Sequence, residues 1–555
     1  MKRAYSIKSL ILCLLMVFLT SGHLYGGSEG RAGQTTGTPG SSTENTPEFK
    51  DGELIVKFKS RVSKSKKDKL HAINGSKIKK EYTRFDIDHV EIKKGMTVKD
   101  AMAMYEADPD VLYAEPNYMV RIEAIPNDAF FNQSWGLLNT GQTGGTPGAD
   151  IDAPNAWNIT TGSANVVVAV IDTGVDYGHA DLSANIWVNT GEIAGNGIDD
   201  DGNGYVDDIH GIDTMNNDSD PFDDNGHGTH VAGIIGAQGN NAVGVAGLNW
   251  NVSILACKFV DANGYGFIDG AIRCLDYVKA LKASGVNIVA TNNSWAGFAY
   301  SQALYDAINA QRDILFFAAA GNGGGYNDTD PLFPASYFLP NVVSVTATDD
   351  TDGMPWFSNF GRRSVHLGAP GESILSTLPA VNYFNIPGGY GSYSGTSMAT
   401  PHVTGVAALL KAQNPASSWI DIKNLILSGG DTVASMTGNT LTGRRLNAFG
   451  SLSCVSSPLF SAIAFPTVFT AGTQEFLAAL SINCASSVGP VTVTSSASET
   501  ITLRDDGVAP DLAAGDGIFS ASWKPASPYT NLAFTSPAGS ETVEAPVPDP
   551  VITAV

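Results

Sequence analysis

An aspartate, a histidine and a serine stand at the ends of three strongly patterned segments of this chain. The segment VVVAVIDTGVD ends an apolar, β-branched stretch at Asp172, directly before Thr-Gly. DNGHGTHVAG places His227 just before a helix of small residues, and SGTSMATPHVTGVAALL places Ser397 at the start of another helix. In open α/β sheets, sites form where parallel strands end and the adjoining helices begin. These side chains could therefore act as a nucleophile, its base and the group that orients the base.

Each segment alone has a simpler explanation. An Asp before Thr-Gly is often a turn residue, and Gly-Thr-Ser before a helix is usually a cap. The order adds weight, because Asp, His, Ser is one of the chain orders found in serine triads. Three other histidines compete for a catalytic role: His179 in a turn, His230 three residues after His227, and His402 in TPHV. For these three, packing or hydrogen bonding is favoured over direct catalysis.

The segments around these residues predict an α/β fold with a parallel sheet. Between residues 124 and 452, continuous apolar strands such as SILACKFV, NIVATNNSW and VVSVTATD alternate with helical patterns. This alternation is typical of a parallel sheet flanked by helices on both faces. Before it, residues 48–123 predict a small basic α+β unit that opens with GELIVKFK. After it, residues 455–555 have the short alternating runs of a β-sandwich-like module.

The first residues predict export. Basic residues precede an apolar run from Leu10 to Leu19, which is too short to span a bilayer, so residues 1–26 have the order of a secretory signal peptide. Residues 27–47, rich in Gly, Ser and Thr, are expected to form a linker. No later segment is apolar and long enough for a membrane helix. A secreted, extracellular product is therefore expected.

Charge is divided unevenly along the chain. From Ala124 onward, 13 Lys and Arg stand against 39 Asp and Glu. Such an acidic surface disfavours nucleic acid and anionic membranes as partners.

Four cysteines remain once Cys13 leaves with the signal peptide: Cys257, Cys274, Cys454 and Cys484. An even count in an exported protein favours disulfides, for which three pairings exist. Local pairing, Cys257 with Cys274 and Cys454 with Cys484, is favoured. A nucleophilic role for Cys257 or Cys274 is weak, because neither has a plausible base beside it in the sequence.

Together with AAAGN, which lies between the His and Ser segments, these motifs resemble the subtilisin (subtilase) family of serine proteases over about residues 48–452. The resemblance implies a Ser-His-Asp endopeptidase on a parallel α/β sheet. Ser397 would be the nucleophile, His227 the general base and then acid, and Asp172 the residue that holds the imidazole. Asn322 of AAAGN would donate its side-chain amide to the oxyanion beside the backbone N–H of Ser397.

The basic unit over residues 48–123 resembles the inhibitor-type propeptide of this family. The resemblance implies that it serves the enzyme as an intramolecular chaperone and inhibitor, and a cationic unit suits an acidic partner. Autocatalytic cleavage would then fall near residues 121–125. The alternative is an ordinary domain that the mature protein retains.

Substrate binding is expected from NNSWAG, residues 292–297, which resembles the family segment that pairs with the substrate and lines the S1 pocket. Its expected contact residues are Asn293, Ser294, Trp295, Ala296 and Gly297. The family usually has Gly where this chain has Ala296. Leu332 is expected near the pocket floor. Without a nearby acid, an apolar floor favours large uncharged P1 side chains.

Calcium is expected at two sites or more. The first set matches a site common in the family and comprises side chains and carbonyls of Asp128, Asp181, Gly239, Asn241, Val243 and Val245. The second follows from NGIDDDGNGYVDD, residues 196–208. Its ligands fall at positions 1, 3, 5, 7 and 9 of an EF-hand-type loop with Gly at position 6: Asp199, Asp201, Asn203, the Tyr205 carbonyl and Asp207.

This second loop lacks the twelfth ligand, because His210 stands where an EF-hand has Glu. Asp208 or a water could replace it. The alternative is a solvated acidic run. A weaker acidic loop, RDDGVAPDLAAGDG, recurs in the C-terminal module.

The leading hypothesis is a secreted, calcium-stabilised, monomeric serine endopeptidase that processes itself and hydrolyses proteins or peptides. One alternative is a catalytically degenerate scaffold whose C-terminal module binds or adheres. Another is a dedicated processing protease, which would need acidic subsites for a basic substrate, and the substrate segments named above do not have them.

Overall fold

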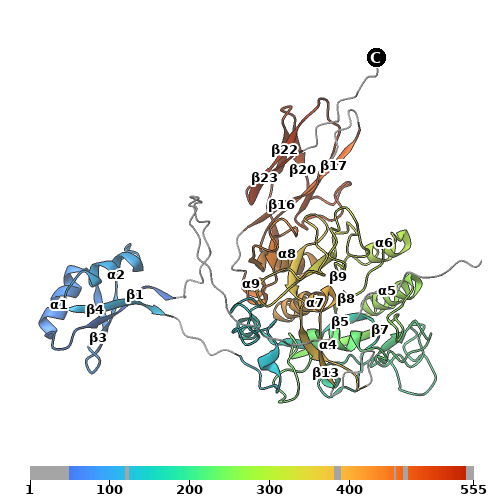
Figure 1. Cartoon of the computed structure of the whole chain (residues 1–555), viewed down its shortest axis with the longest axis horizontal. Coiled ribbons are helices and arrows are strands. Elements are labelled where there is room, and N and C mark those ends of the chain that lie inside the picture. The colour runs from blue at the N-terminus through green and yellow to red at the C-terminus, as the bar shows by residue number, and fades with distance from the viewer. Residues whose placement is uncertain (1–48, 119–123, 381–388, 455–457, 467–472, 545–555) are drawn as a thin grey trace, which may run out of the picture. The chain divides into compact units, whose positions relative to one another are not determined.

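The computed structural model describes residues 49–118, 124–380, 389–454, 458–466 and 473–544 of the 555-residue chain (Figure 1). The chain divides into two compact units, Met1–Arg121 and Ile122–Val555. The expected signal peptide (1–26), the linker (27–47) and most of the expected cleavage region (121–125) lie outside the described residues. Among the described residues, no helix has both the length and the hydropathy that a membrane crossing requires.

The first unit is an antiparallel sheet with two helices. Its strand order is β2-β3-β1-β4. The elements are β1 (Phe49–Phe58), α1 (Lys64–Ile73), β2 (Lys77–Tyr82), β3 (Ile87–Glu91), α2 (Val98–Glu106) and β4 (Val111–Tyr118). Leu54, Val56 and Phe58 alternate on β1 and are buried in one core with Tyr105 of α2. The small α+β unit expected from the sequence is therefore present.

The second unit is built on a nine-stranded sheet of order β14-β15-β11-β10-β9-β8-β5-β7-β6. Every pairing in it is parallel except β14 with β15. The strands are β5 (Gly162–Asp172), β6 (Gly211–Asp213), β7 (Asn251–Lys258), β8 (Ile288–Asn293), β9 (Leu315–Ala319), β10 (Val342–Thr348), β11 (Leu367–Pro370), β14 (Asp431–Thr432) and β15 (Arg444–Arg445).

Helices cover both faces of this sheet, as the continuous apolar strands predicted. Val168 and Val170 of β5 belong to one core with α4 (His227–Gly236) and α7 (Thr396–Gln413). The alternate residues Val167, Ala169 and Ile171 belong to the opposite core with α5 (Ile268–Ala283) and α6 (Gln302–Asn309). A strand that buries both faces has no polar alternation, which explains the VVVAVI run.

Short elements complete this part of the chain. Ser418 and Asp421 form a capping box that fixes the start of α8. The remaining elements are η1 (Phe131–Gln133), α3 (Ala153–Trp157), η2 (Ser183–Asn185), the antiparallel pair β12 (Ile374–Thr377) and β13 (Tyr390–Tyr393), α8 (Trp419–Gly429) and α9 (Ala448–Ser453).

Residues 458–466 and 473–544 form two small antiparallel sheets (Figure 1), and side chains of both sheets share an apolar core. One sheet has the order β16-β17-β18 with β21 also on β17, and the other has the order β20-β19-β22-β23. The strands are β16 (Leu459–Ala464), β17 (Glu475–Asn483), β18 (Ser486–Ser487), β19 (Val491–Ser495), β20 (Thr500–Leu503), β21 (Ile518–Trp523), β22 (Asn531–Ser536) and β23 (Gly539–Glu544).

This C-terminal module shares a core with the larger sheet. Leu480 and Ile482 of β17 lie in the same apolar cluster as Ile426 of α8. Lys423 of α8 and Asp516 of the module, both about 1% exposed, form an ion pair at 3.1 Å. Packing therefore continues past residue 452, where the sequence suggested that the sheet domain ends.

Candidate active site

The parallel strands end together at one edge of the sheet, and the polar residues singled out in the sequence follow them. Asp172 is the last residue of β5, and Asn293 the last of β8. His227 is the first residue of α4, and Ser397 is the second of α7. Helix α7 is buried along nearly its whole length, because its outward positions are small or apolar. The fold thus holds these side chains on rigid elements.

The buried Asp172 and His227, whose side chain is 27% exposed, form a hydrogen-bonded pair. Nδ1 of the imidazole lies 2.7 Å from Oδ1 of Asp172, which also accepts from the backbone N–H of Thr173 at 2.8 Å. Burial of the ring would lower the pKa of His227, but the charge and hydrogen bond of Asp172, with the charge of Asp223, raise it above its ordinary value. The imidazole is therefore a stronger base than a free histidine.

Ser397 sits at the first turn of α7, where backbone N–H groups and the helix dipole favour negative charge. Its hydroxyl donates to the carbonyl of Ser294 at 3.1 Å, and the hydroxyl of Ser294 donates to the carbonyl of Ser397 at 2.8 Å. Catalytic hydrogen bonds often form only when substrate is present. Among the described residues, no hydrogen bond joins Ser397 to His227.

Asn322 follows β9 and has a fixed amide orientation. Its Oδ1 accepts from the backbone N–H and the hydroxyl of Thr396, at 2.8 and 3.0 Å. The amide nitrogen is left to donate, and no hydrogen bond occupies it within the described residues. A Cβ on residue 395 would lie only 3.2 Å from this nitrogen, so the glycine at this position leaves room for the Asn322 amide. The side-chain amide can therefore donate to an oxyanion near Ser397.

The competing histidines are bonded to backbone carbonyls. Nε2 of His230 lies 3.0 Å from the carbonyls of Ile374 and Gly391, and burial lowers the pKa of His230 to about 3. Nδ1 of His402 lies 2.9 Å from the Met398 carbonyl, and Nε2 of His179 lies 2.9 Å from that of Gly389. All three are held by hydrogen bonds that serve packing.

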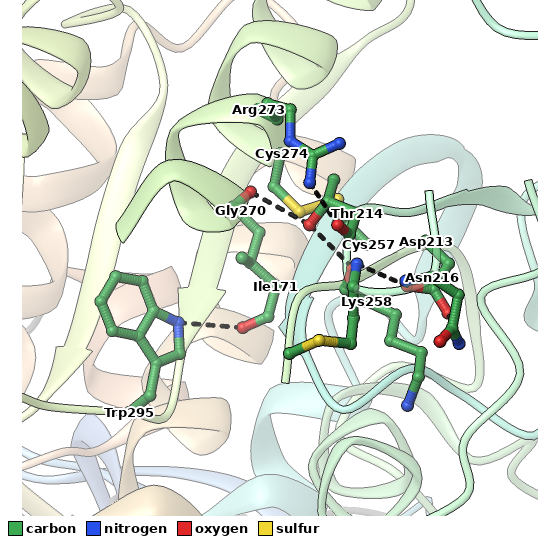
Figure 2. Close-up of a disulfide and its surroundings, with 11 residues drawn as sticks. Ile171, Asp213, Thr214, Asn216, Cys257, Lys258, Gly270, Arg273, Cys274 and Trp295 are labelled. Carbon is green, nitrogen blue, oxygen red and sulfur yellow. Dashed lines mark hydrogen bonds between the residues drawn. A yellow bond between two sulfur atoms is a disulfide. The ribbon is translucent and has the colours of Figure 1, made fainter. Parts of the chain in front are cut away.

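The expected substrate segment runs along the site, although not all its side chains face outward. Asn293 is fully buried and donates to Thr291 and to the Phe317 carbonyl, so its side chain does not face a substrate. The indole of Trp295 donates to the Ile171 carbonyl at 3.0 Å (Figure 2).

Beyond Trp295 the segment pairs with the chain near Leu332. Gly297 exchanges two backbone hydrogen bonds with Phe333, at 2.7 and 2.9 Å. Ala296 precedes this pairing, and Leu332 lies against Gly321, where a Cβ would approach it to 2.4 Å. Residues 296–297 and Leu332 are thus brought together beside Asn322.

Both expected disulfides are present, Cys257–Cys274 and Cys454–Cys484. Cys257 is on β7 and Cys274 on α5, and both are fully buried (Figure 2). The next residue, Lys258, lies opposite Asp172 in the strand pairing and is about 1% exposed. Its ammonium donates to the Thr173 carbonyl at 2.7 Å and to Asp224 at 2.6 Å. Sequence reasoning missed Lys258, because an isolated lysine after an apolar strand carries no motif.

The first expected calcium site forms a cluster of oxygens. Asp181 accepts from the Asn241 amide at 2.8 Å and the Val245 N–H at 2.9 Å, and Asp128 accepts from the Asn240 N–H. Burial raises the pKa of both carboxyls, and the charge of Asp128 raises that of Asp181 further. Oδ1 of Asp128 is buried without a hydrogen-bond partner among the described residues. This orphaned oxygen fits a divalent cation held at this position.

The neighbouring residues of that site are arranged as a turn. Gly239, Val243 and Val245 lie on the 239–245 segment that wraps around Asp181, with Val243 N–H donating to the Asn241 side chain at 2.7 Å. Their carbonyls are available as further oxygen ligands.

The acidic insertion is held together by hydrogen bonds from backbone N–H groups to its carboxylates. Asp199 closes its own turn by accepting the N–H groups of residues 202–204, whereas Asp207 accepts those of residues 195–197, earlier in the insertion. Asn203 and Tyr205 are linked to each other by a hydrogen bond of 2.8 Å. Of the three expected carboxylate ligands, Asp201 belongs to a group of converging carboxylates among the described residues, and the Asn203 amide donates to two members of that group, Asp201 and Asp208.

The other members of that group are Glu192 and Asp208, whose oxygens lie within 4.8 Å of those of Asp201. Asp208 is fully buried, and burial together with the charge of Asp201 raises its pKa. The sequence pattern could not identify Glu192, because it lies outside the acidic run. A second such group, Asp505, Asp511 and Asp516, comes from the acidic loop of the C-terminal module.

Comparison with known proteins fits this architecture. A family described as the subtilase family matches residues 163–445, and a fervidolysin N-terminal prodomain matches residues 36–117. The thermophilic serine proteinase of Bacillus sp. (strain AK1) is 33% identical over 407 residues, covering 73% of this chain and 88% of that protein. Thermitase of Thermoactinomyces vulgaris is 36% identical over 301 residues, covering 54% of this chain and 92% of thermitase. A solved protease structure from Pseudoalteromonas arctica is 27% identical, with a TM-score of 0.47, and covers 60% of this chain and 99% of that one.

The two family matches and the two sequence relatives define a serine protease with an N-terminal prodomain. The chain belongs to the subtilase family.

Proposed function

We propose that this subtilase is a secreted, calcium-stabilised endopeptidase that cleaves peptide bonds through an acyl-enzyme on Ser397. The observation that carries the proposal is the 2.7 Å bond between Asp172 and His227 at the same sheet edge as Ser397. The second support is the Asn322 amide, whose oxygen is held by Thr396 so that its nitrogen can donate. Together they supply a nucleophile, a base, an orienting acid and an oxyanion donor.

In this mechanism the Ser397 oxygen attacks the substrate carbonyl carbon while its proton moves to Nε2 of His227. Asp172 holds the other ring nitrogen as the donor and stabilises the imidazolium that forms. The oxyanion is bound by the Asn322 amide and the Ser397 N–H. His227 then gives its proton to the leaving amine, and a water molecule deprotonated by His227 hydrolyses the acyl-enzyme.

The substrates we propose are proteins or peptides with a large uncharged P1 side chain. Ala296, Gly297 and the buried Leu332 form an apolar surface beside Asn322, and residues 293–297 present no acid to a basic side chain. This composition disfavours a dedicated processing protease for basic sites.

Calcium would be held by two oxygen clusters and would stabilise the fold without entering the reaction. The first is the Asp128–Asp181 site, where a dication would neutralise two buried carboxyls. The second is the group Glu192, Asp201 and Asp208, which closes the insertion between β5 and α4. A bound ion adds stability by mass action, because the unfolded chain lacks the site.

The prodomain would act as an intramolecular chaperone and inhibitor, and the enzyme would remove it by cleavage near residues 121–125. An added fragment of residues 48–123 should therefore slow hydrolysis by the mature enzyme. If the fragment neither binds nor inhibits, the prodomain has another role.

Labelling with a fluorophosphonate probe tests the proposal. Wild-type mature protein should be labelled at Ser397, and Ser397→Ala should be unlabelled and should keep its prodomain when its N-terminus is sequenced. Ser392→Ala, an exposed serine on β13, is the control and should label normally. A wild-type protein that folds but takes no label would favour the degenerate scaffold with a binding module.

A further inference from the structure

A second buried carboxylate lies beside the proposed catalytic pair. Asp223 is in the loop that leads into α4, four residues before His227, and its exposed fraction is 0%. Among the described residues, no lysine or arginine forms an ion pair with it. A buried carboxylate without a cation is costly unless many hydrogen bonds compensate for lost water.

Five donors surround this carboxylate. Oδ1 accepts from the Thr173 hydroxyl at 2.9 Å and from the N–H groups of Asn225 and Gly226 at 3.0 and 2.8 Å. Oδ2 accepts from the N–H and the hydroxyl of Thr229, at 2.8 and 2.6 Å.

Both hydroxyls are forced to give their protons to Asp223. Oγ1 of Thr173 already accepts from the Gly228 N–H, and Oγ1 of Thr229 accepts from the Asp176 N–H, each at 2.9 Å. All five donor groups, which belong to four residues, therefore point a hydrogen at the carboxylate. This arrangement favours the ionised form of Asp223. Burial raises the pKa of Asp223, and these hydrogen bonds oppose that rise.

The two threonines connect Asp223 to the proposed triad. Thr173 follows Asp172, and its own N–H donates to the Asp172 oxygen that binds His227. Thr229 belongs to the first turn of α4, the helix that begins with His227. A single carboxylate thus holds the end of β5 and the start of α4 in fixed relation.

Asp223 also adds negative charge near the imidazole. The other titratable groups around this cluster come from β5, β7, β13, α4 and the same loop: Asp172, Lys258, Tyr393, His230 and Asp224. His230 is neutral, since burial lowers its pKa to about 3. Tyr393 is also neutral, because burial and the charge of Asp223 raise its pKa to about 12. The Lys258 ammonium is paired with Asp224. The net field at His227 therefore comes from two carboxylates.

We propose that Asp223 is a positioning residue of the catalytic site, which fixes Asp172 and His227 through two threonine hydroxyls and stabilises the imidazolium with a second negative charge. This inference rests on the proposed roles of Asp172, His227 and Ser397. Asp223 does not touch the substrate, so its effect should appear in kcat and in the pH profile rather than in KM.

The test compares the pH dependence of kcat/KM for Asp223→Asn and wild type, using a peptide substrate and the mature enzymes. Asn keeps the size but removes the charge. The acid limb should move to lower pH by about one pH unit, since at an effective dielectric of about 20 removing one nearby unit charge changes a pKa by an amount of this order. The plateau should fall about 10- to 100-fold with KM nearly unchanged. Asp276→Asn removes an exposed charge from α5 and should match wild type.

An acid limb at the wild-type position would overturn the electrostatic part of the inference, and an unchanged plateau would overturn the positioning part. If Asp223→Asn does not fold, Thr173→Val and Thr173→Ser replace it. Thr173→Ser keeps the hydroxyl that bonds to Asp223, and Thr173→Val removes it. The kcat of the Val variant should therefore be about tenfold lower than that of the Ser variant, and equal kcat values for the two variants would refute the role of this hydroxyl. Failure of the proposed function would be distinguishable from failure of this inference, because the wild-type protein would then not react with the fluorophosphonate probe at Ser397.

Discussion

Removing the Cys257–Cys274 bridge should destabilise the enzyme without disabling it. The bridge closes a loop with a sequence separation of 17 residues. In the chain-entropy model, a loop of this length contributes about 3 kcal/mol to the free energy of unfolding. Both cysteines are fully buried, so replacing each with Ala also leaves a small cavity, at a cost of roughly 1 kcal/mol each. The double variant should therefore lose about 3–5 kcal/mol.

The measurement is guanidinium unfolding of the double Ala variant in a Ser397→Ala background, which prevents self-digestion, at a fixed Ca²⁺ concentration. Cys454→Ala with Cys484→Ala is the matched control. That bridge has a separation of 30 residues and half-exposed cysteines, so the entropy model gives about 3.5 kcal/mol with little cavity cost.

In the otherwise wild-type enzyme, the Cys257 and Cys274 substitutions should change kcat/KM by less than about threefold. Strand β7 remains hydrogen-bonded to β5 and β6, so Lys258 and Asp172 keep their register. A loss of stability below about 1 kcal/mol would refute the entropic argument. A large loss of kcat with little loss of stability would mean that the bridge itself shapes the catalytic edge.

Four other outcomes are expected. Asn322→Ala should lower kcat about 10²- to 10³-fold with little change in KM, because the Asn322 amide is needed only to bind the oxyanion. A rise in KM as large as the fall in kcat would contradict this prediction. The kcat/KM value should rise with pH through the raised pKa of His227, since only the neutral ring accepts a proton, and an acid limb below about pH 6.5 would be the wrong sign. A chelator should lower thermal stability and hasten self-digestion, and millimolar Ca²⁺ should restore both. Asp199→Ala with Asp201→Ala should lower the number of bound Ca²⁺ ions and increase proteolytic nicking between residues 191 and 224. If the Ca²⁺ stoichiometry and the nicking are both unchanged, the loop is a solvated acidic run without a calcium site.

The residues at strand and helix ends were predictable because they sit within long local patterns. Asp172 closes an apolar strand and Ser397 opens a buried helix, so the strand and helix patterns, the motifs at their ends and the family resemblance together placed both at one edge of the sheet. The disulfides were predictable for a similar reason, since parity and local spacing favoured one pairing of three.

Residues that act through the tertiary structure were not predictable. Asp223 looks like an ordinary loop acid, and its importance depends on Thr173, 50 positions away in the sequence. The EF-hand spacing stays a prediction for Asp207, whose carboxylate accepts the N–H groups of residues 195–197, and Glu192, a member of the converging carboxylates, lies outside the pattern. Local spacing cannot report which distant amide reaches a carboxylate first.

The shared core between the sheet domain and the C-terminal module limits how the gene can be divided. A truncation at residue 454 would uncover Ile426 and its apolar neighbours and would leave the Lys423 ammonium buried without its carboxylate. Such a product would expose an apolar surface and would favour aggregation over secretion. The module therefore cannot be exchanged between homologues as a cassette, and any chimaera should keep β16 and β17 from the same parent as α8.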